Sequence, residues 1–94
     1  MNEEWIRRCD EICGIIDDAR GREDEWEIQQ RAEEAAAAAG RLAGDLDKGM
    51  SSASKPAQLY NAAQLLRRAA DSIASGTLDE GEQLVRDAQG ELGK

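Results

Sequence analysis

The stretch PAQLYNAAQLLRRAADSIASGTLDEGEQLVRDAQGEL, residues 56–92, decides the fold because it predicts a helical hairpin. In residues 56–75, apolar side chains recur at spacings of four and three and therefore share one face of a helix. Gly76 should end that helix, and Thr77 to Glu80 has the sequence of a capping box, which starts a second helix. Because the connection is so short, the two helices should lie antiparallel and adjacent. The apolar stripe of the first helix is Leu59, Ala63, Leu66, Ala70 and Ile73, and that of the second is Leu78, Val85, Ala88 and Leu92.

The loop that leads into this hairpin should be residues 48–55, KGMSSASK, where glycine and serine gather. Gly49 suits the C-terminal cap of the preceding helix. Ser54 suits an N-cap, with Pro56 in the first turn of the next helix. We therefore expect the chain to change direction between two long helical segments here.

The N-terminal half is helical in pattern, but the phase of its apolar residues changes. One apolar stripe runs through residues 5–19, and a second, through residues 28–46, keeps the same spacing two residues out of step. A break near Gly21 explains this shift. The alternative is one long bent helix, because no Ser, Thr, Asp or Asn stands before Arg22 to cap a new start.

The sequence therefore predicts an all-α fold, a small antiparallel bundle of three to four helices with a C-terminal helical hairpin. All of it should form one helical domain, residues 1–94. The approximate helices are 2–20, 22–48, 56–75 and 78–92.

The core of such a bundle should be thin. Leu, Ile and Val make up 15 of the 94 residues and Phe is absent, a low share that, with high net charge, also fits disorder. Sixteen alanines and a single proline favour folded helices instead. Close alanine packing, a second copy of the chain or a partner should then complete the core. Gly40 and Gly44 predict a tight helix contact, either within the bundle or across a homodimer.

The formal net charge of -8 lies entirely in the N-terminal half of the chain. Residues 1–47 carry 14 acidic side chains and 6 arginines, whereas residues 48–94 carry 6 acids and 6 bases. This asymmetry argues against direct binding to nucleic acid or to an anionic membrane and favours a partner with a basic surface. The alternative is a solvated surface that only keeps the chain soluble.

Acidic pairs recur every seven residues in EEWIRRC, DEICGII, DDARGRE and DEWEIQQ, residues 3–30. A seven-residue repeat holds such pairs on nearly one face of a continuous helix. Seven helical residues rise about 10.5 Å, and three phosphates of one DNA strand span about 10.2 Å, so the carboxylates have the spacing of a phosphate mimic. The alternative is that these acids only solvate the helix and pair with arginines four residues on, as Glu3 would with Arg7.

The run EDEWE, residues 23–27, contains no Lys or Arg to balance its charge, and the third acidic pair also has few bases nearby in the sequence. Trp26 lies in this run and off the phase of the alanine-rich stripe, so both burial and contact with a partner are open to it. The predicted partner-binding residues are Asp10, Glu11, Asp17, Asp18, Glu23, Asp24, Glu25, Trp26 and Glu27.

Residue types that catalysis and metal binding need are missing. The chain has no histidine, no nucleophile motif and no glycine-rich phosphate loop, so we expect no catalytic residue, no cofactor and no enzyme activity. Cys9 and Cys13 should be small core residues on one helical face rather than a disulfide or a zinc site, so no metal is expected. The N-terminus lacks the pattern of a signal peptide and no stretch is long enough to span a membrane, which favours a cytoplasmic location.

Together these features predict a non-catalytic protein-binding protein. In size and charge, though in no motif, the chain is similar to the small acidic phage-encoded proteins, anti-CRISPR-like inhibitors among them, that disarm bacterial defence complexes. That likeness implies an inhibitor in the host cell cytoplasm, which blocks a basic surface of a nucleic-acid-binding complex by phosphate mimicry. The alternative is a helical adaptor, scaffold or secretion-associated bundle that pairs through its apolar seam.

Overall fold

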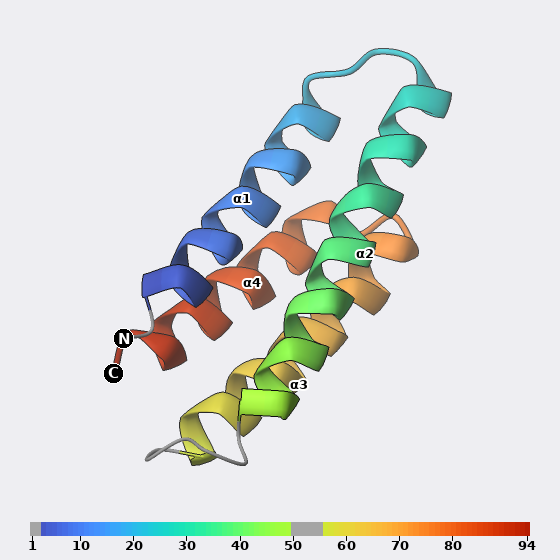
Figure 1. Ribbon diagram of the computed structural model, residues 1–94. Helices are drawn as coiled ribbons and strands as arrows, with labels where there is room; N and C mark the ends of the chain where they lie inside the picture. The colour runs from blue at the N-terminus through green and yellow to red at the C-terminus, as the bar shows by residue number, and fades with distance from the viewer. Residues whose placement is uncertain (1–2, 50–55) are drawn as a thin grey trace.

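The computed structural model describes residues 3–49 and 56–94, and these residues form four helices. They are α1 (Glu3–Arg20), α2 (Glu25–Gly49), α3 (Pro56–Ala74) and α4 (Leu78–Leu92). α1 packs on α2 and α4, and α3 packs on the same two helices, so the helices run alternately up and down around one core (Figure 1). The predicted all-α antiparallel bundle is confirmed. The cap predicted at Ser54 lies outside the described residues.

The turn between α3 and α4 is built on Gly76. Its φ of 90° lies in the left-handed region, which glycine adopts without steric cost. The N–H groups of Gly76 and Thr77 donate hydrogen bonds to the carbonyl oxygens of Ile73 (3.0 Å) and Ser72 (2.8 Å). This pair of bonds is a Schellman motif, which satisfies the last carbonyl groups of α3. The predicted role of Gly76 in ending the helix is confirmed.

The capping box predicted at Thr77 is wrong. α4 does begin directly after Thr77, but the Thr77 side chain makes no capping hydrogen bond. In a capping box, the carboxylate three residues on, here that of Glu80, accepts a hydrogen bond from the N–H of the cap residue. The Thr77 N–H is already donated to Ser72 at the end of α3. The tight turn has therefore used the donor that the capping box needs.

α1 and α2 are separate helices because the chain leaves helical geometry at residues 21–24. α2 restarts at Glu25, where the Asp24 carboxylate accepts a hydrogen bond from the N–H of Trp26 at 2.9 Å. Asp24 is therefore the N-cap of α2. The break predicted near Gly21 is confirmed, and the alternative of one long bent helix is wrong. α2 starts three residues later than predicted because Asp24 supplies the cap.

One core fills the space between the four helices. Every helix contributes large aliphatic side chains to it, and small residues such as Ala35, Ala39 and Ala62 let the helices approach closely. These side chains are shielded from solvent within the single chain. The largest fully buried aliphatic side chains are Ile12, Ile16, Leu42, Leu46, Leu66, Ile73, Val85 and Leu92.

Gly40 and Gly44 make no tight helix contact within the chain. A Cβ atom placed at either position would meet nothing within 4 Å. Gly40 is exposed and Gly44 is half-buried, so both lie toward the outer side of α2. The contact predicted within the bundle is therefore wrong at these glycines, whereas the contact across a homodimer stays a prediction.

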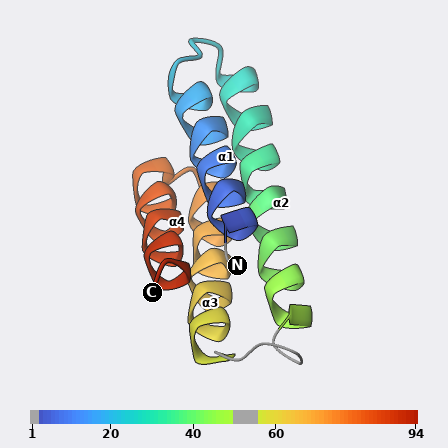
Figure 2. The same ribbon diagram turned by 60° about the vertical axis from the view of Figure 1, so that its left-hand side comes forward.

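The bundle is a rod with extents of 44 × 18 × 16 Å. At one end, the connection between α1 and α2 projects beyond the turn between α3 and α4, as two views show (Figures 1 and 2). None of the helices in residues 3–49 and 56–94 combines the length and apolar character needed to cross a membrane. The projecting end carries the acidic run that the sequence singles out.

Candidate functional site

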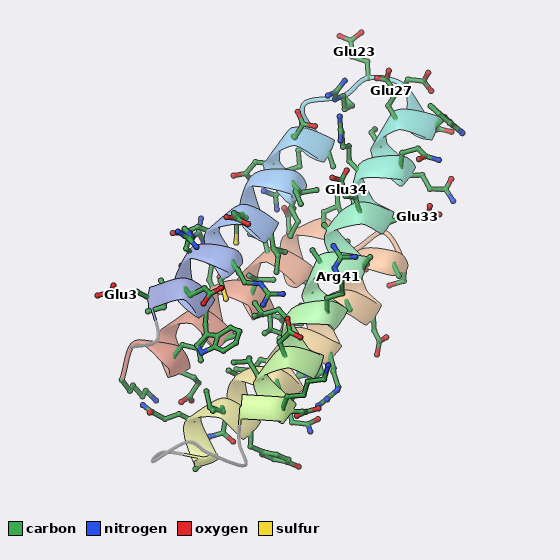
Figure 3. All side chains as sticks on the ribbon, in the orientation of Figure 1. Glu3, Glu23, Glu27, Glu33, Glu34 and Arg41 are labelled. Carbon is green, nitrogen blue, oxygen red and sulfur yellow. The ribbon has the colours of Figure 1, made fainter. Side chains whose placement is uncertain are left out.

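Residues 23–27, which we name the acidic tip, form the projecting end of the rod. Glu23 and Asp24 lie in the connection between α1 and α2, and Glu25, Trp26 and Glu27 form the first turn of α2. Figure 3 shows Glu23 and Glu27 at this end, far from Glu3 at the start of α1. The Asp24 cap fixes the acidic tip to the start of α2.

The four acidic pairs do not lie along one helix. α1 carries the pairs at residues 3–4, 10–11 and 17–18, and the pair at 24–25 lies beyond the reversal of the chain. A seven-residue repeat aligns side chains only along a continuous helix. The even spacing of acidic pairs is therefore confined to α1, and the acidic tip is a separate cluster.

Asp10 is part of the contact between α1 and α4. Its carboxylate accepts hydrogen bonds from Arg86 at 3.1 Å and from the side-chain amide of Gln89 at 2.8 Å. The same Gln89 amide donates to the carbonyl oxygen of Ile6 at 3.0 Å. These bonds join the first and last helices, so Asp10 has a structural partner. Glu11, its neighbour, lies in an exposed pair with Arg7 at 4.0 Å.

Asp17 belongs to a network centred on Arg20 at the end of α1. The Arg20 guanidinium lies 2.9 Å from Asp17 and 2.6 Å from Asp79, and it also pairs with Glu82 of α4. The hydrogen bond to Glu82 is the main cause that raises the pKa of Arg20. Asp17 is thus the helix-internal member of a link between α1 and α4.

Asp18 joins two arginines between α1 and α2. Its carboxylate lies 3.1 Å from Arg22 and 3.0 Å from Arg31. Arg31 also donates a hydrogen bond to Glu34 at 2.8 Å, and this bond is the main cause that raises the pKa of Arg31. The prediction that the third acidic pair lacks nearby bases is wrong, because Arg22 follows Asp18 by four residues and the reversal of the chain brings Arg31 to the same carboxylate. Of these two partners, Arg31 is the one that depends on the arrangement of the helices.

Three carboxylates of the acidic tip have no cation beside them. Within residues 3–49 and 56–94, no Lys or Arg nitrogen lies within 4.0 Å of Glu23, Asp24 or Glu25. Glu27 has only a distant partner, since its carboxylate lies 3.8 Å from Arg22. Arginines therefore neutralise fewer carboxylates at the acidic tip than along α1.

Trp26 presents its indole ring to solvent at the acidic tip. Its side chain is 66% exposed, whereas Trp5 is half-buried with the Arg8 guanidinium 5.7 Å from its ring centroid. A shallow hollow of about 270 Å³ lies beside Trp26, and Arg22 and Arg31 line it together with Glu27, Gln30 and Glu34. A tryptophan ring attracts cations to its face, and carboxylates pair with them. The acidic tip therefore presents both an aromatic ring and carboxylates to solvent.

The cysteines lie apart from this surface, as expected of core residues. Both are buried free thiols, and desolvation by burial raises the pKa of Cys9 to about 12 and that of Cys13 to about 11. The reactive, metal-binding form of cysteine is the thiolate, which these environments disfavour. In the part of the chain that the structure describes, no group of three or more His, Cys, Asp or Glu side chains is placed to hold a metal ion.

Neither a protein-family model, nor a curated protein, nor a solved structure matches this chain.

Proposed function

We propose that this chain is a non-catalytic, inhibitor-type binder whose acidic tip occupies a basic, nucleic-acid-binding surface of a protein partner. The inhibitor would compete with the nucleic acid by placing carboxylates where phosphates bind. This role fits best with a phage-encoded anti-defence protein that acts in the cytoplasm of the host cell.

The observation that carries the proposal is the exposure of Trp26 in a run of carboxylates of which three, those of Glu23, Asp24 and Glu25, have no ion pair among the described residues. A single exposed apolar residue is ordinary on a protein surface. Tryptophan, however, is enriched among the residues that dominate binding energy, and it contacts cationic side chains favourably. Glu25, directly before Trp26 in the chain, and Glu23, three residues before it, have no ion pair among the described residues. A basic partner supplies both contacts at once.

Charge distribution supports the same proposal. The net charge of -8 should speed encounters with a positively charged partner, most strongly at low salt. Since Asp10, Asp17 and Asp18 already pair with arginines, the unbalanced charge of the acidic tip is the part most available to a partner. Mimicry by a compact cluster, rather than by a stripe along a long helix, is the form that this geometry favours.

A capture experiment tests this proposal. The full chain is immobilised and exposed to a lysate of its native host at about 0.1 M and about 1 M salt, where charges are screened beyond roughly 10 Å and 3 Å respectively. The test variants are Trp26→Ala and the double variant Glu23→Lys/Glu27→Lys. Asp24 is left unchanged because its carboxylate caps α2, so its loss would disturb the helix itself.

The matched control is Glu3→Lys/Glu4→Lys, which changes the charge by the same amount at the opposite end of α1. We expect a partner that the wild-type chain and this control retain at low salt, that both test variants lose, and that added DNA or RNA displaces. Capture that survives reversal of the acidic tip, or that nucleic acid leaves intact, would contradict the proposal.

A helical adaptor remains the second candidate. Its predicted apolar seam, Leu42 included, is fully buried in the core of the single chain, so pairing through that seam requires the bundle to open. Ile28, by contrast, is half-buried near the projecting end and is open to a partner without unfolding. An adaptor that uses this surface should fail with Ile28→Ser while tolerating reversal of the acidic tip.

A further inference from the structure

An apolar groove of about 290 Å³ lies between the first turns of α2 and the turn that joins α3 to α4. Its apolar wall includes Ile28 and Ala32 of α2, Ile73 of α3 and Leu78 of α4. It does not overlap the hollow beside Trp26, because different residues of α2 line the two. α2 therefore carries both a groove and a hollow at its N-terminal end, and Glu25 of the acidic tip lines the groove.

The groove exists because α1 and α2 extend further along the axis of the bundle than α3 and α4 do at this end. The Schellman turn at Gly76 ends α3 sharply, whereas α1 and α2 continue past it to the projecting end (Figures 1 and 2). The apolar stripe of α2 continues as well, up to Ile28. No further turn of α3 or α4 is present to cover it, so Ile28 and Leu78 stay half-buried.

Carboxylates, and no cations, stand among the residues that line this groove. Glu25 and Glu33 both line it, and no Lys or Arg does. Glu25 has no ion pair among the described residues, and the Glu33 carboxylate meets only the amide of Gln29, at 3.5 Å. Figure 3 shows the Glu33 side chain directed away from the bundle. The rim thus offers negative charge around an apolar centre.

The volume of the groove and the charge of its rim together indicate what kind of molecule could bind in it. The volume lies at the lower limit of pockets that enclose small molecules, roughly 300 to 1,000 Å³, and matches apolar side chains better than a cofactor. A second copy of this chain, with the same charge of -8, would bring like charges to the rim. A basic peptide segment with an apolar anchor satisfies both the wall and the rim.

We propose that this groove receives a basic peptide segment of a protein partner, which inserts a large apolar side chain between Ile28 and Leu78 and pairs its Lys or Arg side chains with Glu25 and Glu33. This inference rests on the proposed function, since the segment would belong to the same basic partner. It adds an apolar anchor site to the electrostatic contact at the acidic tip.

Selection from a display library of short random peptides on the immobilised full chain tests this inference. Enriched peptides should carry at least one large apolar residue flanked by Lys or Arg. Enrichment of purely basic peptides would overturn the groove and leave the acidic tip standing. Enrichment of neutral or acidic peptides would overturn both, and so would a selection that enriches no sequence class.

Variants then locate the binding of the enriched peptides. Ala74→Trp places a bulky ring at an exposed position that lines the groove, and we expect about tenfold weaker binding. Ala37→Trp, at an exposed position of α2 outside both hollows, is the matched control and should bind as the wild type does.

The charge arm compares Glu25→Lys/Glu33→Lys, which should also lose about tenfold or more in affinity, with the control Glu3→Lys/Glu4→Lys. Equal affinity for wild type and Ala74→Trp, or an equal loss of affinity with Ala37→Trp, would overturn the inference.

Discussion

Ile73 in α3 occupies the space that a methyl group at Gly81 in α4 would need. A Cβ atom at position 81 would overlap Cγ1 of Ile73 and would lie 3.2 Å from its Cδ1 and 3.5 Å from the carbonyl oxygen of Ala69. Both residues are buried, so the Ile73 side chain cannot rotate into solvent to make room for a methyl group at position 81. The absence of a side chain at Gly81 is what lets the two helices of the hairpin meet here.

We therefore expect Gly81→Ala to destabilise the protein by about 1–3 kcal/mol, because it overpacks the interface between α3 and α4. This loss should appear although alanine is the better helix former by about 1 kcal/mol. Gly90→Ala, in the same helix with nothing within 4 Å of an added Cβ, is the control and should stabilise slightly. Urea denaturation measures both, and equal stabilisation by the two substitutions would disprove the close contact.

Arg20 should contribute to stability through its three carboxylate partners, Asp17, Asp79 and Glu82. Single exposed ion pairs contribute little, but a network that joins two helices should be worth about 1 kcal/mol. We expect Arg20→Met to lower the free energy of unfolding at low salt and to matter less at about 1 M salt, where screening weakens the wild-type network. Arg7→Met, whose one partner lies 4.0 Å away, is the control and should be neutral at both salts. A cost at Arg20 that salt does not change would point to lost packing instead.

The helices were predictable from the sequence because their signals are local. The spacing of apolar residues in α3, and Gly76 after it, needs only neighbouring residues to be interpreted. The N-cap at Asp24 also has a local signal, an Asp followed three residues later by Glu27 and then by Ile28, but the same Asp continues the seven-residue repeat of acidic pairs, which obscures its capping role. The capping box at Thr77 is absent for a reason that lies at the end of the preceding helix, α3.

The candidate site was less predictable because charge balance depends on contacts between helices. Asp18 meets Arg22, four residues later in the chain, but it also meets Arg31, thirteen residues later, which only the packing of α2 on α1 brings to it. The groove beside Ile28 has no local signal at all, since it arises from the unequal reach of α2 and the hairpin. Local signals in the sequence thus predict where helices begin and end, whereas a surface formed by several helices can be identified only once their arrangement is known.

The two tryptophans should report their different surroundings in fluorescence. Trp26 is 66% exposed and Trp5 is half-buried, so a soluble quencher such as acrylamide should reach Trp26 more readily. We expect Trp26→Phe to shift the emission to shorter wavelength and to reduce quenching, with a change in stability within about 0.5 kcal/mol, as for surface substitutions. Trp5→Phe is the paired variant. It should leave the emission of Trp26, which is quenched more readily and lies at longer wavelength. The reverse pattern would show that Trp26 is covered.

Stability should fall with rising pH above about 9 because of Cys9 and Cys13. Their pKa values of about 12 and about 11 in the fold exceed the value of 9.0 for an unperturbed thiol. Below pH 9.0 the thiols are protonated in both states, and their stabilising effect is fully present. From there to about pH 11 the unfolded chain releases thiol protons while the fold retains them, so the free energy of unfolding declines. The slope is at most about 1.4 kcal/mol per pH unit for each thiol.

Urea denaturation between about pH 8 and pH 11 checks this prediction in the wild type and in Cys9→Ala/Cys13→Ala. The double variant should be less stable at the lower pH, because it loses two buried side chains, yet its stability should decline less steeply as pH rises. Both proteins share every other side chain, so the difference between the two slopes isolates the thiols. Parallel slopes would mean that the thiols ionise as readily in the fold as in the unfolded chain, and hence that water reaches the core between α1 and α4.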